Sequence, residues 1–383
     1  MKVAFLIERL DSRRGGMETS ATEFLSEMVL LGPEIHVVTQ SASPEFYIAP
    51  VHQLGVRGTG RTARYRNFVR SADEFLKAER WDVVHAVTPC LNCNLYQPRS
   101  GITQQALSRS VAVRKNWLTR SLRKLGGALN SKQRLLTKLE HQLLSREKPP
   151  MVAALSHFMR RQIESVYALP KENLRDVFNG VTVPLPGEAE RKTIREKLRR
   201  ELGLSETDSI ALFAGHNFRR KGLPKILEAL AKPQAQNWRL LVAGKDSPAH
   251  YQKLARELGV VSRVQFLGSR SDVRELYLAA DVCVLPSYYD PCSRTVLEAI
   301  SLGVPCIATV FDGSSECITH GENGFVLESP EAVEKLAAHL GALNDRATQI
   351  KMSGKAVVLR ERLSMRRHAQ EIFSLYQIIV KGF

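Results

Sequence analysis

Short apolar runs alternate with helical stretches along this chain, and the alternation limits the folds that are available to it. Residues 2–7 (KVAFLI) and 35–39 (IHVVT) are apolar runs of strand length, and apolar residues recur at helical spacing over 17–31 between them. Further apolar runs at 82–87 and 151–155 continue the series. Strands that are buried on both faces of a parallel sheet have this composition, with helices covering the faces. The pattern therefore predicts parallel βαβ units.

The pattern restarts after residues 179–188 (NGVTVPLPGE), which are rich in turn-forming residues and predict a linker. A polar helix is expected over 191–202, and a long final helix is expected over 362–380. Between these helices, strands are expected at 209–214, 239–243, 264–267, 282–285 and 305–309.

This order predicts two α/β domains in series, each a Rossmann-like, doubly wound parallel sheet. We expect the first domain at 1–183, the second at 187–361, and a C-terminal helix at 362–383 that packs back toward the N-terminal domain. Open parallel sheets bind ligands beyond the carboxyl ends of their strands. We therefore expect a site in a cleft between the domains, built from loops that follow strands.

The composition is that of an ordinary globular protein. Of 383 residues, 44% are hydrophobic and 25% are charged, which excludes disordered, collagen-like and disulfide-stapled chains. No uncharged apolar run approaches the roughly 18 residues of a membrane span, and the first apolar run is too short for a signal peptide. We therefore expect a cytoplasmic protein.

The six cysteines include one C-x-x-C pair, Cys90 and Cys93. A structural zinc site needs four ligands, and no second C-x-x-C or nearby His pair supplies the rest. Buried reduced thiols are therefore the default interpretation, with zinc ligands or a redox pair as the alternatives.

The first candidate loop, Arg13-Arg14-Gly15-Gly16, lies between the first expected strand and the first expected helix. Adjacent glycines let the backbone approach a ligand, and a helix N-terminus offers free N–H groups to an anion. An ordinary tight turn is the alternative.

The second candidate loop contains three consecutive cations, Arg219, Arg220 and Lys221, at the start of a helix in the second domain. Cations at a helix N-terminus oppose the helix dipole, and a bound anion relieves that mismatch. The Arg fork and the Lys point charge together suit a diphosphate. A solvated basic turn is the alternative.

The third candidate segment carries two carboxylates, Asp290 and Glu298, on either side of a helix start at Ser293, a candidate N-cap. Glu298 lies inside an apolar helix, where a carboxylate is costly to bury without donors such as sugar hydroxyls. Capping or ion pairing explains either acid alone. The pair, with a free helix N-terminus between its members, favours a sugar site.

Together, these three segments resemble the retaining glycosyltransferases of family 4, which have the GT-B fold. The segment DPCSRTVLE, preceded by ADVCVLPS and followed by AISLGVPCIAT and GENGFV, resembles the E-x7-E region of that family. GHNFRRKGL resembles its diphosphate-binding segment, and RRGG resembles its N-terminal glycine loop. The resemblance covers nearly the whole chain. Within the family, the chain is similar to the enzymes that add glucose to a heptose of the lipopolysaccharide core.

The resemblance implies a catalytic role for four residues. Glu298 accepts hydrogen bonds from the ribose hydroxyls of a nucleotide-sugar donor, and Asp290 contacts hydroxyls of the transferred sugar. Arg220 and Lys221 hold the diphosphate and stabilise the leaving group. Asp290 departs from the family pattern, because a Glu, one methylene longer, usually stands there.

The resemblance implies further substrate contacts. Gly15 and Gly16 let backbone N–H groups reach the donor, and Arg270 lies against the nucleotide base. No metal or cofactor is expected, because Arg and Lys take the electrostatic role that Mg²⁺ has elsewhere and no D-x-D stands at a strand end. The remaining substrate-binding candidates are Ser293, Arg294, Thr295 and Val296.

The implied reaction retains the configuration of the anomeric carbon, because the acceptor hydroxyl attacks from the face that the nucleoside diphosphate leaves. No general base is assigned. His85, Arg99 and Ser100 are candidates for the acceptor side, and a buried, hydrogen-bonded histidine is the alternative interpretation of His85.

Positive charge is concentrated in residues 104–148. The chain has 55 Lys and Arg against 39 Asp and Glu, a net charge of +16, and this segment alone has eleven against two. Leucines recur there at helical spacing, and basic amphipathic helices bind anionic membrane surfaces. We therefore expect peripheral contact with the inner face of the cytoplasmic membrane. A solvated basic face on packed helices is the alternative.

Nucleic-acid binding, the competing use of this charge, is not expected, since the sequence shows no aromatic-studded sheet motif, zinc finger or helix-turn-helix.

The sequence therefore predicts a retaining hexosyltransferase that moves glucose from UDP-glucose to a lipid-linked saccharide, such as a heptose of the lipopolysaccharide core. A GDP-mannose-dependent mannosyltransferase of the same family and a UDP-sugar 2-epimerase on the same fold are the alternatives. A glycogen-type phosphorylase or synthase and a non-catalytic nucleotide-binding homologue are more distant ones.

Overall fold

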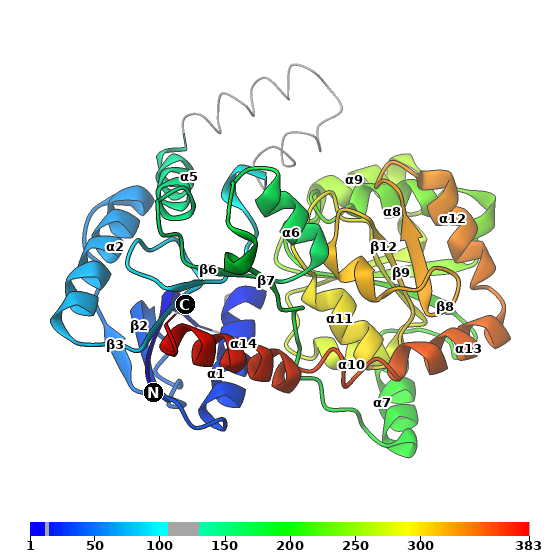
Figure 1. The fold of residues 1–383 in the computed structure, drawn as a ribbon. Coiled ribbons are helices and arrows are strands. Elements are labelled where there is room, and N and C mark those ends of the chain that lie inside the picture. Colours follow the sequence, from blue (N-terminus) through cyan, green and yellow to red (C-terminus); the bar gives the residue numbers. More distant parts are fainter. Residues whose placement is uncertain (12–14, 106–129, 383) are drawn as a thin grey trace. The chain divides into compact units, whose positions relative to one another are not determined.

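The computed structural model of the chain describes residues 1–11, 15–105 and 130–382, which divide into two compact units. The first unit comprises Met1–Val181 and Met365–Phe383, and the second unit comprises Thr182–Ser364 (Figure 1). The chain thus leaves the first unit, forms the second and returns to the first.

Within the described residues, the first unit contains a seven-stranded parallel sheet in the order β3-β2-β1-β4-β5-β6-β7. Its strands are β1 (Lys2–Leu10), β2 (Glu34–Ala42), β3 (Val51–Gln53), β4 (Val83–Ala86), β5 (Leu95–Tyr96), β6 (Met151–Ala154) and β7 (Leu174–Asp176). Its described helices are α1 (Gly16–Val29), α2 (Gly60–Ala78), α5 (Ser131–Leu144), α6 (His157–Glu164), the 3-10 turn η1 (Lys171–Asn173) and α14 (Met365–Val380).

The core of the first unit forms between its sheet and the two helices α1 and α14. Val3, Phe5 and Ile7 on one face of β1 and Ala4 and Leu6 on the other have no exposed surface, as a strand covered on both faces requires. The C-terminal helix α14 lies beside α1 (Figure 1) and adds Ile372 and Tyr376 to this core. The final helix of the chain is therefore part of the first unit.

The second unit contains, in its described residues, a six-stranded parallel sheet in the order β10-β9-β8-β11-β12-β13. Its strands are β8 (Ser209–Ala214), β9 (Trp238–Ala243), β10 (Val264–Gly268), β11 (Val282–Leu285), β12 (Cys306–Thr309) and β13 (Gly324–Leu327). Its helices are α7 (Glu188–Glu201), α8 (Leu223–Leu230), α9 (Ala249–Glu257), α10 (Val273–Ala279), α11 (Arg294–Ser301), α12 (Val333–Ala342) and α13 (Arg346–Val357). Its 3-10 turns are η2 (Pro233–Ala235), η3 (Val261–Arg263) and η4 (Gly313–Cys317).

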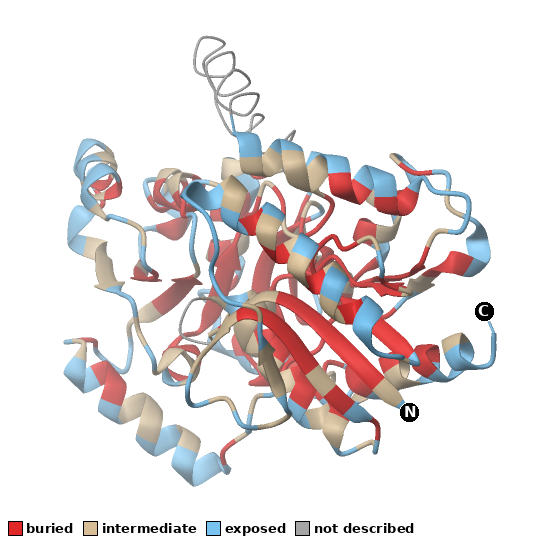
Figure 2. Cartoon of the chain, turned by 90° about the vertical axis from the view of Figure 1, so that its left-hand side faces the viewer, coloured by how far each residue is buried: buried red, intermediate tan, exposed pale blue. Residues whose placement is uncertain are grey.

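The predicted fold class is confirmed, since each unit is a doubly wound parallel sheet with helices. Figure 2 shows strands that are buried along most of their length and helices with a buried and an exposed face. In each sheet the strand order reverses once, between β1 and β4 in the first and between β8 and β11 in the second. Ligands of doubly wound sheets bind at such reversals, beyond the carboxyl ends of the strands.

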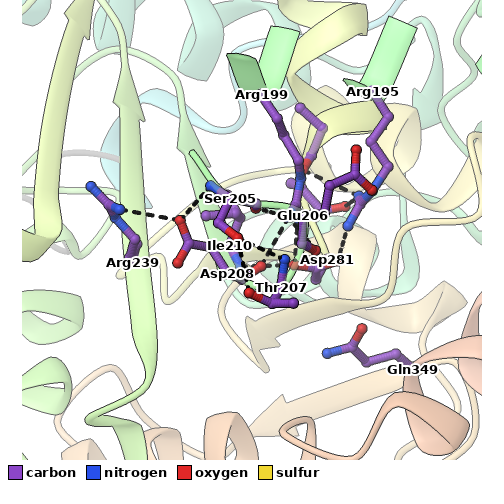
Figure 3. Close-up of polar contacts among 12 residues, drawn as sticks. Arg195, Arg199, Ser205, Glu206, Thr207, Asp208, Ile210, Arg239, Asp281 and Gln349 are labelled. Atoms are coloured by element: carbon purple, nitrogen blue, oxygen red, sulfur yellow. Dashed lines mark hydrogen bonds and ion pairs between the residues drawn. The ribbon is translucent and has the colours of Figure 1, made fainter. Parts of the chain in front are cut away.

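At the amino ends of β8 and β11, away from the ends where ligands bind, a buried ion cluster surrounds Asp281 (Figure 3). Arg195 and Arg199 point from α7 toward its carboxylate and bind it at 2.6 and 2.9 Å, and Arg346 binds it at 3.1 Å. Asp281 also accepts a hydrogen bond from Ile210 N at 2.8 Å. Arg199, which is 1% exposed, donates in addition to the backbone carbonyls of Ser205, Glu206, Asp208 and Ala279. The cluster thus holds α7 on the amino ends of the two central strands.

Part of the basic segment 104–148 belongs to the described structure. Residues 130–148 include helix α5, whereas 106–129 lie outside the described residues. Among the described helices, none combines the length and the apolar composition needed to cross a membrane.

Candidate functional site

The strand reversal of the second sheet brings two of the candidate segments together. Strand β8 leads into residues 215–222 and α8, and β11 leads into 286–293 and α11. Because β8 and β11 are paired in parallel, both loops leave the same edge of the sheet. Tyr288 N donates to Arg220 O at 2.8 Å, which links the two loops directly.

The conformation of the first loop is set by a carboxylate from the neighbouring strand end. Asp246, which follows β9, accepts hydrogen bonds from Asn217 N at 3.0 Å and from Phe218 N at 2.9 Å. Asn217 has a left-handed φ of 58°, which Asn tolerates better than most residues. Its Oδ1 accepts a hydrogen bond from Arg220 N at 3.3 Å. Asp246 therefore fixes the turn that presents the cations.

Gly222 allows the two loops to approach each other. Its φ is +83°, and a Cβ atom there would lie 2.1 Å from Pro286 O. Gly215 plays a similar part, because a Cβ there would lie 2.8 Å from Cδ of Lys221. Both positions therefore favour glycine for the backbone angle, since φ is +149° at Gly215, and at Gly222 the backbone of Pro286 also leaves no space for a Cβ atom.

Lys221 and Asp290 form an ion pair at the edge of the sheet. The Lys221 Nζ donates to Asp290 Oδ2 at 3.0 Å, and the two side chains are 11% and 13% exposed. Beside them, the Nε of Arg220 is buried and has no hydrogen-bond partner within the described residues. A buried guanidinium N–H without an acceptor is costly, and an anionic ligand would satisfy it.

Glu298 is oriented by two neighbours. Its Oε1 accepts from Arg294 at 2.9 Å, one turn earlier in α11, and its Oε2 accepts from the Tyr277 hydroxyl of α10 at 3.0 Å. Thr295 ties the same helix to β8 by donating to Ala214 O at 3.1 Å. Hydrogen bonds from α10 and from the first turn of α11 thus fix the direction of the Glu298 carboxylate.

The start of α11 differs in part from the sequence prediction. Ser293 is the N-cap residue by position, but among the described residues its hydroxyl makes no capping hydrogen bond. Its N–H instead donates to Asp312 Oδ1 at 3.0 Å. Val296 has no exposed surface in this structure, and its side chain is part of the core.

Arg270 is engaged by a neighbouring carboxylate. Its Nε donates to Asp272 Oδ1 at 2.7 Å, and one terminal nitrogen pairs with Asp272 Oδ2. The hydrogen bond from Arg270 is the main cause that lowers the pKa of Asp272. The guanidinium therefore has a fixed direction, on the loop that follows β10.

In the first unit, Gly15 and Gly16 lie at the start of α1, where the strand-end loop enters the helix. Gly15 is the N-cap residue, and its carbonyl accepts from Thr19 N at 3.1 Å. Arg13 and Arg14, the other half of the RRGG segment, lie outside the described residues.

His85 is a buried core histidine, which is the alternative that the sequence left open. It has no exposed surface, its Nδ1 is hydrogen-bonded to the Tyr376 hydroxyl at 2.7 Å, and burial holds its pKa well below the usual value. The interpretation that His85 lines the acceptor side is therefore wrong for this structure, because the imidazole ring packs in the core against the rings of Phe5 and Phe24.

Arg99 and Ser100 lie close to α1. Arg99 is 8% exposed, donates to Gln97 Oε1 at 2.9 Å and to Ser20 Oγ at 2.5 Å, and lies over the Phe24 ring. Ser100 is exposed, and its hydroxyl contacts Met17 Sδ at 3.4 Å. Ser100 is thus the accessible member of the predicted acceptor-side residues.

The comparisons with known families divide the chain as its sheets do. Residues 14–183 match the family described as Glycosyltransferase Family 4, and residues 194–356 match Glycosyl transferases group 1. The chain is a glycosyltransferase that combines a family 4 domain with a group 1 domain. The expected resemblance is confirmed, and the two sheets of this glycosyltransferase are those of the GT-B fold.

Individual relatives agree with this assignment. The glycosyltransferase is 27% identical over 329 residues, 84% of each chain, to the lipopolysaccharide glucosyltransferase WaaG of Escherichia coli K12. The crystal structure of WaaG matches 99% of this chain and 100% of its own, with a TM-score of 0.80 and 24% identity. The structure of Anabaena Alr3699/HepE in complex with UDP-glucose matches 98% of this chain and 99% of its own, with a TM-score of 0.70 and 18% identity.

Three residues of the glycosyltransferase that shape the site were not predicted from the sequence: Asp246, Tyr277 and Asp312. Each acts through a hydrogen bond to a residue that is distant in the chain, so neither spacing nor periodicity marks it. An acid two residues after a strand-end glycine, Gly244, was a usable signal for Asp246 alone.

The cysteines of the glycosyltransferase are all buried and free of disulfides. Burial raises the pKa of Cys90 to about 11, so this thiol is neutral at pH 7. In the described ranges, no group of three or more His, Cys, Asp and Glu side chains is arranged to hold a metal ion.

Proposed function

We propose that this glycosyltransferase moves glucose from UDP-glucose to a lipid-linked saccharide, such as a heptose of the lipopolysaccharide core, with retention of configuration. One observation carries the proposal: Lys221, Arg220 and Asp290 meet where the strand order of the second sheet reverses. The relative named as a lipopolysaccharide glucosyltransferase supports this acceptor, and the similar structure that holds UDP-glucose supports this donor.

In this proposal the donor diphosphate binds beside the two cations. The unpartnered Nε of Arg220 and the ammonium of Lys221 donate to phosphate oxygens. Arg270 packs against the base. These donors act on a diphosphate whose charge grows as the sugar leaves, so they stabilise the transition state more than the bound donor.

The two carboxylates bind hydroxyl groups. Glu298 is held by Arg294 and Tyr277 in a fixed direction and accepts from the ribose hydroxyls. Asp290 accepts from hydroxyls of the transferred hexose with the oxygen that Lys221 does not use. Its side chain is one methylene shorter than that of Glu, so the hexose is expected to lie closer to the backbone of the loop.

In the chemical step, the bond between the anomeric carbon and the diphosphate oxygen breaks as positive charge develops on the sugar. The acceptor oxygen then bonds to the same face of that carbon, and its proton passes to the leaving diphosphate oxygen. This route balances without a protein base, and it needs positive charge near the diphosphate, which Arg220 and Lys221 supply.

The basic segment 104–148 fits an acceptor that is presented at an anionic membrane. It carries eleven Lys or Arg and two Glu. Attraction to anionic lipid amounts to about 1 kcal/mol for each basic residue near the surface. We propose that this segment holds the enzyme at the inner face of the cytoplasmic membrane.

A transfer assay tests the proposal. Purified protein is incubated with labelled UDP-glucose, ADP-glucose or GDP-mannose and with lipopolysaccharide truncated after its heptoses. We expect glucose transfer from UDP-glucose, with an α-linkage in the product by NMR. Mannose transfer would favour the mannosyltransferase alternative, and conversion of UDP-N-acetylglucosamine without an acceptor would favour an epimerase. A β-linkage or no transfer from any donor would contradict the proposal.

A further inference from the structure

A third acidic side chain, Asp312, lies beside the Lys221–Asp290 pair and has no part in the reaction proposed above. It is fully buried. Its Oδ1 accepts hydrogen bonds from Ser293 N at 3.0 Å, from Ser314 N at 3.0 Å and from Ser314 Oγ at 2.5 Å. Its Oδ2 is also buried and has no hydrogen-bond partner in the part of the chain that the structure describes.

The hydrogen bonds at Oδ1 join two loops of the candidate site. Asp290 N donates to Phe311 O at 2.9 Å, and Gly313 N donates to Asp290 O at 3.0 Å. The carboxyl of Asp312 adds a side-chain link to Ser293 N, three residues after Asp290. The backbone that carries Asp290 is therefore fastened on both sides, and Asp312 supplies one of the fastenings.

A capping role alone does not account for the second oxygen. Asp312 is the N-cap residue of η4, and an N-cap needs a single acceptor, which Asn or Ser also provides. A buried carboxylate oxygen without a donor is costly. A proton on Oδ2 removes the buried negative charge, which is the larger part of that cost. In agreement, burial and then the charge of Asp290 raise the pKa of Asp312 to about 7, although Lys221 opposes the shift.

The proton on Asp312 changes the charge that a donor meets. With Asp312 neutral, the charges of Lys221 and Asp290 cancel, and Arg220 leaves the site with a net charge of +1. With Asp312 ionised, the four groups sum to zero. A diphosphate with two negative charges is attracted less strongly by the second arrangement.

The remaining titratable groups around Asp312 do not change charge near pH 7. Burial raises the pKa of each neighbouring thiol above its usual value, so these thiols stay neutral; they belong to Cys292, Cys306 and Cys317. Glu316 and Arg362 lie near Cys317, and their opposite charges offset each other. His216, which lies near Lys221, has a pKa lowered by burial and is neutral above pH 7.

We propose that Asp312 is a positioning residue of the donor site, whose protonated carboxyl fixes residues 290–293 and keeps the site positive toward a nucleoside diphosphate. The inference rests on the proposed function, and it adds that donor affinity falls as the pH rises past neutrality.

The first experiment compares the wild type with Asp312→Asn and Asp312→Ala. UDP-glucose is a suitable probe, because its diphosphate is a diester and does not titrate between pH 6 and 9. We expect the Kd and the KM of the wild type for UDP-glucose to rise about tenfold over this range, with a smaller change in kcat. Asp312→Asn keeps an acceptor for Ser293 N and carries no charge, so its Kd should stay constant with pH.

Asp312→Ala loses the link to Ser293, so its Kd should exceed that of Asp312→Asn at every pH. A Kd of Asp312→Asn that follows the wild-type pH profile would overturn the inference. So would an Asp312→Ala variant that binds UDP-glucose as tightly as the wild type.

A second experiment needs no ligand, so it remains decisive if no nucleotide-sugar binds. The native state holds a proton on Asp312 that the unfolded chain releases near pH 4, so the folding constant of the wild type falls as the pH rises toward 7. Relative to Asp312→Asn, we expect a fall of about tenfold per pH unit between pH 5 and 7, and no change above 7.

A constant ratio of the two folding constants across this range would show that Asp312 is ionised and would overturn the inference. Amide hydrogen exchange at Ser293 should in addition be faster in Asp312→Ala than in Asp312→Asn. Failure of all donors to bind, with these two results intact, would instead remove the proposed function and leave the role of Asp312 within the loop.

Discussion

At the scale of single residues, Lys221 has one observed role, the ion pair with Asp290, and one proposed role, the binding of a diphosphate. In this structure its ammonium pairs with Asp290, and both side chains are largely withdrawn from water. In the proposed function, a donor diphosphate would compete with Asp290 for this cation, whereas the Nε of Arg220 has no partner within the described residues to lose. Glu298 differs from these two cations, because each of its carboxylate oxygens already accepts a hydrogen bond, one from Tyr277 of α10 and one from Arg294 of α11.

Replacing either Lys221 or Glu298 by Ala should therefore remove most of the transfer activity. We expect kcat/KM to fall by about 100-fold or more, the effect of removing one well-placed electrostatic group from a transition state. Circular dichroism and the melting temperature should show an intact fold. Lys253→Ala and Glu257→Ala are matched controls, because both side chains are exposed on α9. Near wild-type turnover of either site variant would show that the assignment is wrong.

The residues of the site differ in how far the sequence reveals them. Arg220, Lys221, Asp290 and Glu298 are visible because each is a polar residue in or just after a loop that follows an apolar strand. The buried state of His85 depends on Tyr376, which is 291 positions away, and no local pattern predicts such a contact. Asp312 is hidden for the same reason, since its burial depends on the pairing of two loops.

At the scale of elements, the two ends of the strands β8 and β11 have different tasks. Their carboxyl ends carry the ion pair and the loops of the candidate site, whereas their amino ends carry the Asp281 cluster (Figure 3). Burial of the Arg199 guanidinium beside Asp281 would be costly, but the surrounding carbonyls satisfy its remaining N–H groups. The cluster is therefore a structural fastening of α7.

Loss of this fastening should lower stability without affecting chemistry. Arg199→Ala leaves buried carbonyls and part of Asp281 without partners, so we expect a loss of about 3 kcal/mol in the free energy of unfolding in urea. Arg239→Ala is the matched control, because its ion pair with Asp208 is partly exposed and contributes about 1 kcal/mol or less. The kcat per folded molecule should be unchanged in both. Equal stability of the two variants would contradict the structural role.

The sequence predicts the boundaries of the strands only in part, because the end of a strand depends on its pairing with a neighbouring strand. The first strand was expected to end at residue 7, but β1 runs to Leu10, because Arg9 and Leu10 still pair with Ser41 and Ala42 of β2. The strands β3, β5, β7 and β13 were not predicted. The strands β3, β5 and β7 have only two or three residues and form by pairing with a neighbouring strand. Strand β13 does contain a short apolar run, which the sequence analysis did not assign to a strand.

At the scale of the whole molecule, the chain has two doubly wound parallel sheets and a net charge of +16. The two-sheet architecture could be read from the restart of the strand and helix pattern after the 179–188 segment. The return of α14 to the first unit depends on its apolar face, whose Ile372 and Tyr376 complete the core around α1. A net charge of +9 of the total +16 lies in residues 104–148, where eleven Lys and Arg stand against two Glu, and such a concentration attracts an anionic partner.

Sedimentation with lipid vesicles tests where that charge acts. We expect the protein to bind vesicles that contain anionic lipid and to leave neutral ones in solution, with binding lost at high salt. Replacing Arg120, Arg123 and Lys124 by Gln should weaken binding at least about tenfold. Replacing three exposed lysines elsewhere, Lys192, Lys197 and Lys253, is the matched control and should have a smaller effect. Equal binding to neutral and anionic vesicles at low salt would contradict membrane docking.

The central claim is that protein cations, in place of a metal ion, neutralise the diphosphate of a sugar donor. Isothermal titration of UDP-glucose in the presence of EDTA measures this directly, with the wild type compared with the double variant Arg220→Ala, Lys221→Ala. We predict that EDTA leaves the wild-type affinity unchanged and that the double variant binds about 100-fold more weakly or not at all. Wild-type affinity in the double variant, or loss of binding by the wild type in EDTA, would contradict the account.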